Sequence, residues 1–454
     1  MLLWKRWGLG VLALCVMACG AALVPVWVTE LEGYQSSNYL YVGEDEATSY
    51  LVSVYRLKGL VQLTELNGDG QVVAEWEVSA SELEFLSDAN LIPLGGDRAM
   101  LVGRRPEQVL LLDPHGGQIE WGLKGLQLAE DEYLSIWSSH LTSTGTLVFS
   151  GTVFKGVNEI EERIPAFGIV DQKLNVLQLQ THPEFDNSSL FYDADNQRLV
   201  AVGSYEDENT PSIVQILDEN LTIQSEQTLP YFLRPVEYMH GFVMGNALIE
   251  GEGVNLAVSL DGSISYPTPN DYSVRDRYSV PSGYYEVGTV YDLGVSVRVC
   301  FYDREFVQQW CRQTASPNGS LYLVSASLTD NGEIAFTTWV KAERIMGIGL
   351  SIEELTDALR AGFEVRGEVR KSVSHYVYNQ KGKLVTSFTE PEFFYQGRMT
   401  ICSIFDFCIA ADDITPGVCA ASNAVYRNGN QMVSVTGYCT EEYPVDRRIS
   451  LWQW

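Results

Sequence analysis

Basic residues are scarce in this chain of 454 residues, which has 30 lysines and arginines against 59 aspartates and glutamates and a formal net charge of −29. Proteins that bind nucleic acid neutralise its phosphates with stripes of basic residues. The shortage of positive charge therefore excludes nucleic acid as a partner. The acidic residues gather in short runs such as 43–46 and 159–162, which are typical of solvated loop tips. Calcium binding by some of these loops is the alternative interpretation.

Standard catalytic signatures are also missing. The sequence has no GxSxG, HExxH or GxxxxGK[S/T] motif, and no GxGxxG motif opens a predicted helix. The five histidines stand apart from one another, and His115 and His182 are next to prolines in predicted turns. A calcium-like spacing over 65–70 lacks the acidic residue needed at its twelfth position, which is Trp76. We therefore predict no catalytic residue, no metal site and no cofactor.

Cysteine is absent between residues 20 and 299, and six cysteines follow in the last third of the chain. An even number of cysteines in an exported chain indicates disulfides. The segment VCFYDREFVQQWC is typical of a hairpin that places its two cysteines opposite each other, and a turn at 428–429 predicts a second such pair. Buried thiols are the alternative, and metal binding is disfavoured because CxxC spacing is missing. The predicted pairs are Cys300–Cys311, Cys419–Cys439 and Cys402–Cys408.

The N-terminal segment has the features of an export signal. Lys5 and Arg6 precede an apolar run, and the sequence VMAC that ends at Cys19 resembles the bacterial lipobox, in which the cysteine is lipidated. We predict a signal peptide over 1–18 and a lipid anchor on Cys19 followed by a tether over 19–26. The rest of the chain, 27–454, forms the folded domain.

An uncleaved membrane span from 8 to 28 is the alternative, because 21 mostly apolar residues can just cross a hydrocarbon core of about 30 Å. Both interpretations predict an exported protein held at a membrane of the cell envelope. Gly20 follows the lipobox cysteine at the position where aspartate signals inner-membrane retention. For the lipidated form we therefore expect the outer membrane, on its periplasmic or surface face.

The chain repeats itself as short apolar segments bounded by turn residues, which predicts an all-β protein. LTSTGTLVFSGTV at 141–153 returns as LTDNGEIAFTTWV at 328–340. A second unit consists of an apolar strand, an Asp or Asn turn and another strand, and it recurs at intervals of 42 to 58 residues with one interval of 76. Asp and Asn suit such turns because their side chains accept hydrogen bonds from nearby backbone amides. The turns are centred on Asn67, Asp113, Asp171, Asp218, Asp261, Asp303 and Asn379.

Two strands followed by this hairpin make a four-stranded sheet, and repeats of that size are typical of a β-propeller. The seven turns indicate seven sheets. An eighth sheet begins near the C-terminus, but the sequence there lacks a fourth strand. We expect the segment at 27–32 or the one at 38–43 to supply it, because ring closure leaves no open blade edge. The prediction is one closed propeller of eight four-stranded blades, with seven blades as the alternative.

The hairpin LLLDPHGGQIEW resembles the repeat of quinoprotein-type propellers. This superfamily includes quinone-dependent dehydrogenases and the lipoprotein propeller of the outer-membrane barrel-assembly machinery. The dehydrogenases carry an adjacent-cysteine disulfide and a tryptophan docking motif in each blade, and neither is present in this sequence. The resemblance therefore implies a propeller of the catalytically silent, lipidated kind.

Two regions interrupt the repeat and are the places where we look for function. The insertion over 341–372 contains SIEELTDALRAG, which predicts a helix over 351–361 with a capping box at its start. The other is a tyrosine-rich region over 266–292, which also contains a pair of arginines. Exposed tyrosines and arginines suit glycan or protein recognition, and packing of these side chains within strands is the alternative. Its candidate binding residues are Tyr272, Arg275, Arg277, Tyr278, Tyr284 and Tyr285.

Together these features predict a non-catalytic, membrane-anchored propeller that acts as a monomeric scaffold and binds a protein or an envelope polymer. The alternative is an exported enzyme on the same fold, either a quinone-dependent dehydrogenase or a glycan hydrolase or lyase. A pocket with convergent charged residues and perturbed pKa values would favour the enzyme.

Overall fold

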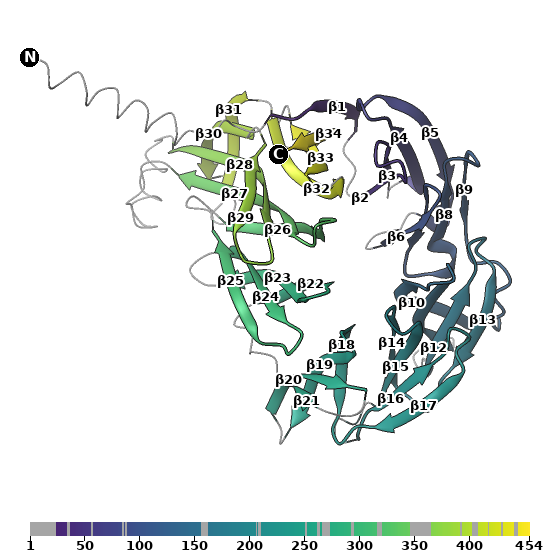
Figure 1. Ribbon diagram of the computed structural model, residues 1–454. Coiled ribbons are helices and arrows are strands. Elements are labelled where there is room, and N and C mark those ends of the chain that lie inside the picture. The colour runs from purple at the N-terminus through teal and green to yellow at the C-terminus, as the bar shows by residue number, and fades with distance from the viewer. Residues whose placement is uncertain are drawn as a thin grey trace, which may run out of the picture. The chain divides into compact units, whose positions relative to one another are not determined.

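The computed structural model describes a protein built of antiparallel β-sheets (Figure 1). It describes residues 24–454 except 34–36, 56–57, 84–85, 87–88, 156–161, 206, 208–209, 250–251, 261–263, 266–272, 292–294, 316–319, 346–364, 391–392, 402–406, 416, 428–429 and 440–443. Each of the eight sheets contains the four strands of one blade, consecutive in the chain in seven of them, which makes the fold an eight-bladed β-propeller and confirms the predicted fold class and blade number. The chain divides into two units, residues 35–316 and residues 1–34 with 317–454.

Residues 35–316 form six blades, and the order of strands within each sheet follows the order in the chain. The first three blades are β2 (Ser37–Val42), β3 (Ser49–Tyr55), β4 (Leu60–Leu66) and β5 (Val72–Ser79); β6 (Asn90–Gly95), β7 (Arg98–Val102), β8 (Val109–Asp113) and β9 (Gln118–Trp121); and β10 (Glu132–Leu141), β11 (Leu147–Lys155), β12 (Glu162–Val170) and β13 (Val176–Thr181). The next three are β14 (Asn187–Asp193), β15 (Arg198–Ser204), β16 (Ile213–Leu217) and β17 (Ile223–Thr228); β18 (Leu233–Met239), β19 (Phe242–Ile249), β20 (Glu252–Ser259) and β21 (Ile264–Ser265); and β22 (Ser273–Val280), β23 (Gly283–Tyr291), β24 (Val295–Asp303) and β25 (Gln308–Thr314). Two short 3₁₀ turns, Ser81–Leu83 and Pro106–Gln108, lie beside the second blade.

The core of this unit lies between neighbouring blades. The second strand of a blade, such as β15, is buried along nearly its whole length, whereas the fourth strand, such as β17, is mostly exposed. Val200 and Val202 of β15 pack with Val243 of β19 and Val258 of β20 in one apolar cluster. Each such side chain contributes roughly 1.5–3 kcal/mol on burial. This explains why the middle strands read as continuous apolar runs.

The other unit holds the last two blades. The seventh is β26 (Ser320–Leu328), β27 (Ile334–Ile345), β28 (Val365–Tyr378) and β29 (Leu384–Thr389), and a hairpin of β30 (Phe393–Ile401) and β31 (Phe407–Thr415) pairs with the first half of β28. Strands β27 and β28 thus extend into the predicted insertion, where Lys341 pairs with Lys371 and Ile345 with Gly367. The predicted helix over 351–361 lies outside the described residues.

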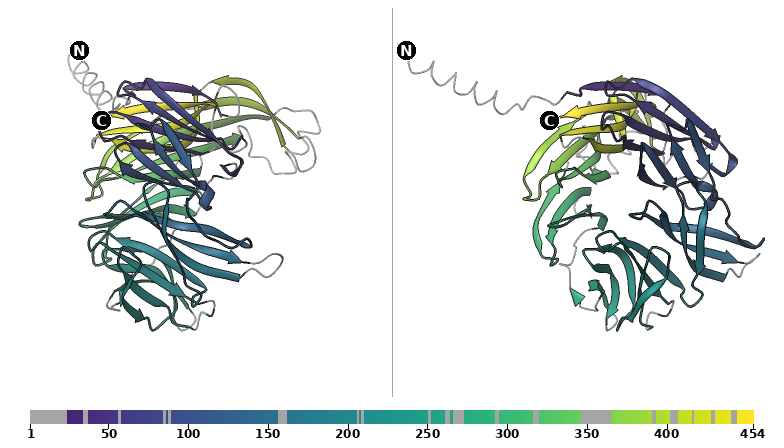
Figure 2. Two further views of the ribbon diagram at one scale, coloured as in Figure 1. Left: turned by 90° about the vertical axis from the view of Figure 1, so that its right-hand side faces the viewer. Right: turned by 45° about the vertical axis from the view of Figure 1, so that its right-hand side comes forward.

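The eighth blade is completed by a strand from the other end of the chain. It contains β32 (Gly417–Arg427), β33 (Gln431–Cys439) and β34 (Pro444–Gln453), and β1 (Trp27–Glu32) pairs antiparallel with β34 from Trp27↔Leu451 to Glu32↔Asp446. In both views of Figure 2 this purple strand lies beside the yellow C-terminal strands. The segment at 27–32 therefore supplies the missing strand, and the segment at 38–43 belongs to the first blade.

Five of the seven predicted Asp and Asn turns share one geometry, whereas Asp113 Oδ1 accepts from the amide of Gly116 and Asp261 lies outside the described residues. In the third blade, Asp171 Oδ1 accepts hydrogen bonds from the backbone amides of Lys173 (2.8 Å) and Asn175 (2.9 Å). Asn67, Asp218, Asp303 and Asn379 bond the amides two and four residues on in the same way. The residue three positions after the Asp or Asn has a positive φ. This residue is Gly70 in the turn of Asn67, whereas in the turn of Asp171 it is the buried Leu174. The apolar side chain reaches the core at a modest cost in backbone strain.

Replacing Asp171 with alanine is expected to lower the stability of the third blade by about 1–2 kcal/mol, because two turn amides lose their acceptor. The matched variant Asp171→Asn keeps the Oδ1 acceptor and should be nearly neutral, since Asn67 and Asn379 make the same bonds. Hydrogen exchange of the Lys173 and Asn175 amides, together with urea denaturation, checks both variants. Equal exchange rates in the alanine variant and the wild type would contradict the prediction.

Candidate functional site

The tyrosine-rich region is largely part of the sixth blade rather than an exposed loop. Tyr284 and Tyr285 on β23 are both 0% exposed, so these two side chains pack within the blade, which is the alternative that the sequence left open for them. Tyr278 on β22 is half-buried. Among the described tyrosines of this region, Tyr291 at the end of β23 faces solvent, with 72% exposure. Tyr272 lies outside the described residues.

The two arginines of this region have different surroundings. Arg275 is half-exposed, and its Nε lies 3.6 Å from Asp276 Oδ2. Arg277 is inserted between two blades: its Nε donates to Glu286 Oε1 at 2.7 Å, and its Nη1 lies 3.7 Å from Glu237 Oε2 on β18. The Glu286 side chain is 2% exposed, so the ion pair with Arg277 compensates a buried charge.

Glu237 has the most strongly perturbed carboxyl group in this cluster. Its pKa is raised to about 7, and burial is the largest cause; Arg277 acts in the opposite direction, and the nearby charges of Glu286 and Asp276 add to the increase. The carboxyl group is therefore protonated in a substantial fraction of molecules at neutral pH. Structural ion-pair networks also raise the pKa of carboxyl groups in this way. The partners of Glu237 lie between two adjoining blades, as expected for such a structural network.

Rising pH should destabilise the protein through Glu237. Its folded pKa of about 7 lies above the ordinary value of 4.5, so the folded state holds the extra proton between these limits and loses stability as pH rises through them. The side chain is 30% exposed, so we expect a loss of about 1–2 kcal/mol. Urea denaturation at pH 4.5 and pH 7.5 should show a smaller pH effect in Glu237→Gln. An equal pH effect in both proteins would contradict the prediction.

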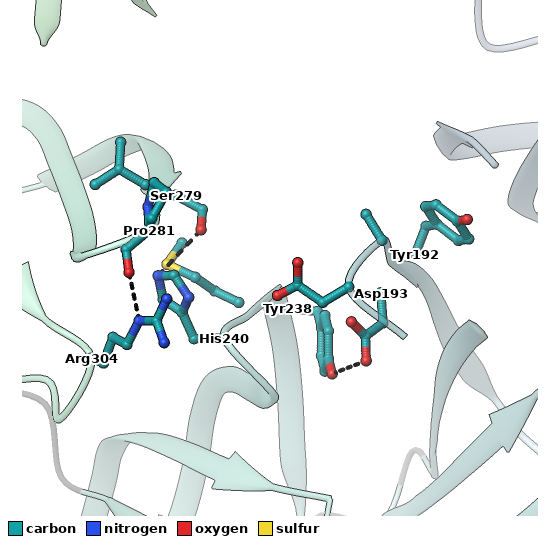
Figure 3. Close-up of a pocket in the computed structure, with 11 residues that line it drawn as sticks. Tyr192, Asp193, Tyr238, His240, Ser279, Pro281 and Arg304 are labelled. Carbon is teal, nitrogen blue, oxygen red and sulfur yellow. Dashed lines mark hydrogen bonds between the residues drawn. The ribbon is translucent and has the colours of Figure 1, made fainter. Parts of the chain in front are cut away.

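A pocket of about 350 Å³ lies where three successive blades of residues 35–316 turn from their first to their second strand. Figure 3 shows Tyr192, Asp193 and Tyr238 on one side of the pocket and His240, Ser279 and Arg304 on the other. The turns after β14, β18 and β22 supply most of the lining, and Arg304 comes from the turn between β24 and β25. The pocket is thus positioned by the rigid ends of strands.

Asp193 is the anionic anchor of the pocket. Its Oδ2 accepts hydrogen bonds from the Tyr238 hydroxyl (2.7 Å), Arg198 Nε (2.9 Å) and Asn196 Nδ2 (2.9 Å). Burial by itself would raise the pKa of Asp193, but these hydrogen bonds and the charge of Arg198 lower it overall. The carboxylate therefore stays ionised. It also holds the Tyr238 ring in place and contributes negative charge to the wall.

The His240 and Ser279 pair is not arranged as a nucleophile and its base. His240 Nε2 lies 2.7 Å from the Gly283 carbonyl oxygen, which can only accept, so this nitrogen carries the hydrogen. Ser279 Oγ lies 3.2 Å from the same nitrogen, which has no lone pair left to take the serine proton. Arg304 Nε likewise donates to the Pro281 carbonyl oxygen at 2.6 Å. These contacts fix the turns that line the pocket.

Sequence reasoning missed this pocket because its residues come from turns far apart in the chain. The repeat could have indicated the pocket, because the turn between the first and second strands lies at the same end of every blade. The acidic turn YDADN at 192–196 follows β14 at that position. The exposed Asp195 in this turn lies at the pocket and offers a second carboxylate.

The predicted cysteine sites are only partly within the described residues. Cys300 and Cys311 form a disulfide across β24 and β25, as the hairpin spacing predicts. Cys19 and Cys402 lie outside the described residues, as do the side chains of Cys408, Cys419 and Cys439. The described residues contain no helix that is long and apolar enough to span a membrane. Within the same residues, no group of three His, Cys, Asp or Glu side chains is arranged to bind a metal ion. In the turn at 65–70, Asn67 Oδ1 accepts hydrogen bonds from two backbone amides.

No family model and no curated protein matches this chain. Among solved structures, it is similar to BamB from Moraxella catarrhalis, with 11% identity and a TM-score of 0.43 over 95% of this chain and 100% of that one. It is also similar to the β-propeller domain of the Trilobed protease from Pyrococcus furiosus, with 10% identity and a TM-score of 0.41 over 79% and 98% of the two chains. The putative TolB from Agrobacterium tumefaciens is 16% identical, with a TM-score of 0.34 over 54% of this chain and 83% of that one. The sequence identities and TM-scores are low, so the fold assignment rests on the order of strands in the eight sheets.

Proposed function

We propose that this protein is a non-catalytic binding propeller, held by a lipid on Cys19 at the outer membrane of the bacterial cell envelope, that binds a protein or an envelope polymer. The observation that carries the proposal is the pocket between the turns after β14, β18 and β22. Its fixed hydrogen bonds pre-form a binding surface, and the His240 nitrogen beside Ser279 donates to a backbone carbonyl. Pre-formed pockets of this size suit a side chain or a short segment of a partner.

The charges at the pocket favour a basic group on the partner. Asp193 stays ionised in the wall, and the exposed Asp195 adds a second carboxylate. The net charge of −29 steers positively charged partners toward the protein and repels acidic ones. Arg304 on the opposite wall is held by Pro281 and accommodates a neighbouring acidic or carbonyl group of the same segment. A lysine or arginine within an extended segment fits this arrangement.

The test is capture from an envelope extract of the source organism with the immobilised full-length chain, followed by mass spectrometry. We expect wild-type protein to retain a basic partner at low salt, Asp195→Lys to lose it, and Asp131→Lys to keep it. The control makes the same charge change at an exposed residue outside the pocket. Equal capture by all three proteins, or turnover of compounds from a sugar and alcohol panel, would overturn the proposal.

The membrane anchor is tested separately. Cells that are given a radioactive fatty acid should label the wild-type protein and not the variant Cys19→Ala, and the variant should appear in the soluble fraction. Labelling of both proteins would count against Cys19 as the anchor. Membrane retention of an unlabelled wild-type protein would favour the uncleaved span over 8–28.

A further inference from the structure

The pocket between the turns after β14, β18 and β22 carries one uncompensated charge of each sign among its described lining residues. Asp195 and Arg304 are exposed there, and neither forms an ion pair within the described part of the chain. Asp193 differs, because Arg198 Nε lies 2.9 Å from its Oδ2 and compensates the charge. Figure 3 shows Asp193 and Arg304 on opposite sides of the pocket. A ligand with a positive and a negative group therefore matches the two walls.

Arg304 and Ser279 offer hydrogen-bond donors on one wall. Arg304 Nε donates to the Pro281 carbonyl oxygen, which fixes the guanidinium group, and Nη1 and Nη2 make no hydrogen bond with a described residue. The Ser279 hydroxyl hydrogen remains available, because the neighbouring His240 Nε2 is itself a donor. Such donors beside a fixed positive charge match the two oxygens of a carboxylate. A carbonyl oxygen would leave the charge of Arg304 without a counterion.

His240 offers an acceptor on the same side of the pocket (Figure 3). In the neutral ring Nε2 carries the hydrogen, so Nδ1 holds a lone pair, and no described residue donates to it. A peptide N–H that lies next to the bound carboxylate can donate to this nitrogen. The last residue of a polypeptide carries an N–H and a carboxylate on the same α-carbon, which fits one wall that holds both partners.

The opposite wall is built to receive a cation. The Asp193 side chain is 5% exposed, and its hydrogen bonds all reach Oδ2, so Oδ1 accepts none from the described residues. Asp195 adds a second carboxylate two residues on. The rings of Tyr192 and Tyr238 lie on the same side, and hydrogen bonds from their hydroxyls to carboxylates hold them in place. Carboxylate oxygens beside aromatic rings suit the side-chain cation of lysine or arginine.

We propose that the pocket binds the C-terminal residue of a polypeptide when that residue is lysine or arginine. The α-carboxylate pairs with Arg304 and Ser279, and the last peptide N–H donates to His240 Nδ1. The side-chain cation reaches Asp193 Oδ1 and Asp195. The volume of about 350 Å³ suits one residue of this size. This inference rests on the proposed function, since it uses the same pocket and names the part of the partner that enters it.

The test is isothermal titration of the full-length chain with an N-acetylated tripeptide that ends in lysine with a free carboxylate. The comparison ligands are its C-terminal amide, the same peptide ending in norleucine, and free L-lysine. We expect the acid to bind about tenfold more tightly than the amide, because a charge-assisted pair replaces a neutral contact. The norleucine peptide should bind about tenfold more weakly for the same reason. Free L-lysine should also bind more weakly, because its α-ammonium group places a second positive charge beside Arg304.

Variants assign these preferences to the two walls. Arg304→Gln should lower the affinity for the acid to about that for the amide, and Arg304→Lys should keep part of the preference. Asp195→Asn should reduce the preference for lysine over norleucine. The control Arg105→Gln makes the same change at an arginine outside the pocket, with its side chain 61% exposed, and should bind as wild type does.

Equal affinities for the acid and the amide in the wild type would overturn the proposal. So would an unchanged preference in Arg304→Gln, free L-lysine that binds as tightly as the peptide, or no binding of any peptide. The outcome is separable from that of the proposed function. If capture from the envelope extract depends on Asp195 while the acid and the amide bind equally, the pocket binds a basic group that is not a chain end, and only this inference fails.

Discussion

Replacing Glu390 with alanine is expected to lower the free energy of unfolding by about 3–5 kcal/mol. Glu390 is 1% exposed and follows β29, where its Oε1 lies 2.9 Å from His375 Nε2. Ser434 and Thr436 of β33 donate to its two oxygens at 2.9 and 3.2 Å. The network joins the seventh and eighth blades within one unit. Removal of the carboxylate leaves three buried polar groups without their acceptor.

Urea denaturation followed by tryptophan fluorescence checks this result, because Trp452 Nε1 donates to Ser434 Oγ and reports on the same network. The matched variant Glu390→Gln keeps an acceptor oxygen and should cost roughly half as much or less. An alanine variant whose stability lies within about 1 kcal/mol of the wild type would show that the network contributes little.

Replacing Arg277 with alanine should produce a loss of similar size, about 3–5 kcal/mol, because Glu286 remains buried without its cation. Arg275→Ala is the matched control, since this arginine lies two residues away on β22 with its side chain 51% exposed. It should cost less than about 1 kcal/mol.

The same pair allows a stricter test by double substitution. Arg277→Met combined with Glu286→Leu replaces the ion pair with apolar side chains and should recover most of the stability that Arg277→Ala loses. Thermal unfolding of the wild type, Arg277→Ala and the double variant provides the comparison. If the double variant is as unstable as Arg277→Ala, the loss comes from packing around Arg277 rather than from an uncompensated charge.

The blades could be predicted from the sequence because their turns are local. Asn67, Asp171 and Asn379 form their turns with amides only two and four residues away, so each turn is specified within five residues. The Cys300–Cys311 disulfide is local for the same reason, since both cysteines lie in one hairpin. The pairing of β1 with β34 connects the two ends of the chain, and the sequence left two candidate segments for it.

The candidate sites could not be predicted in the same way. A tyrosine suits an exposed binding surface and a strand core equally well, and only the packing of the sixth blade shows that Tyr284 and Tyr285 are buried. The hairpin of β30 and β31 was missed because its pairing depends on the unusual length of β28. The pocket lined by Asp193 and His240 draws its residues from different blades, so it has no motif in the sequence.

The sequence by itself determined the all-β class, the repeat of four-stranded blades and the turn chemistry, because strand alternation and turn hydrogen bonds depend on residues a few positions apart. The tertiary structure decided which N-terminal segment completes the last blade and which polar side chains are buried in pairs, such as Arg277 with Glu286. It also decided where polar groups remain available for a ligand. These properties depend on contacts between residues that are distant in the chain, and packing alone selects among the many pairings that composition permits.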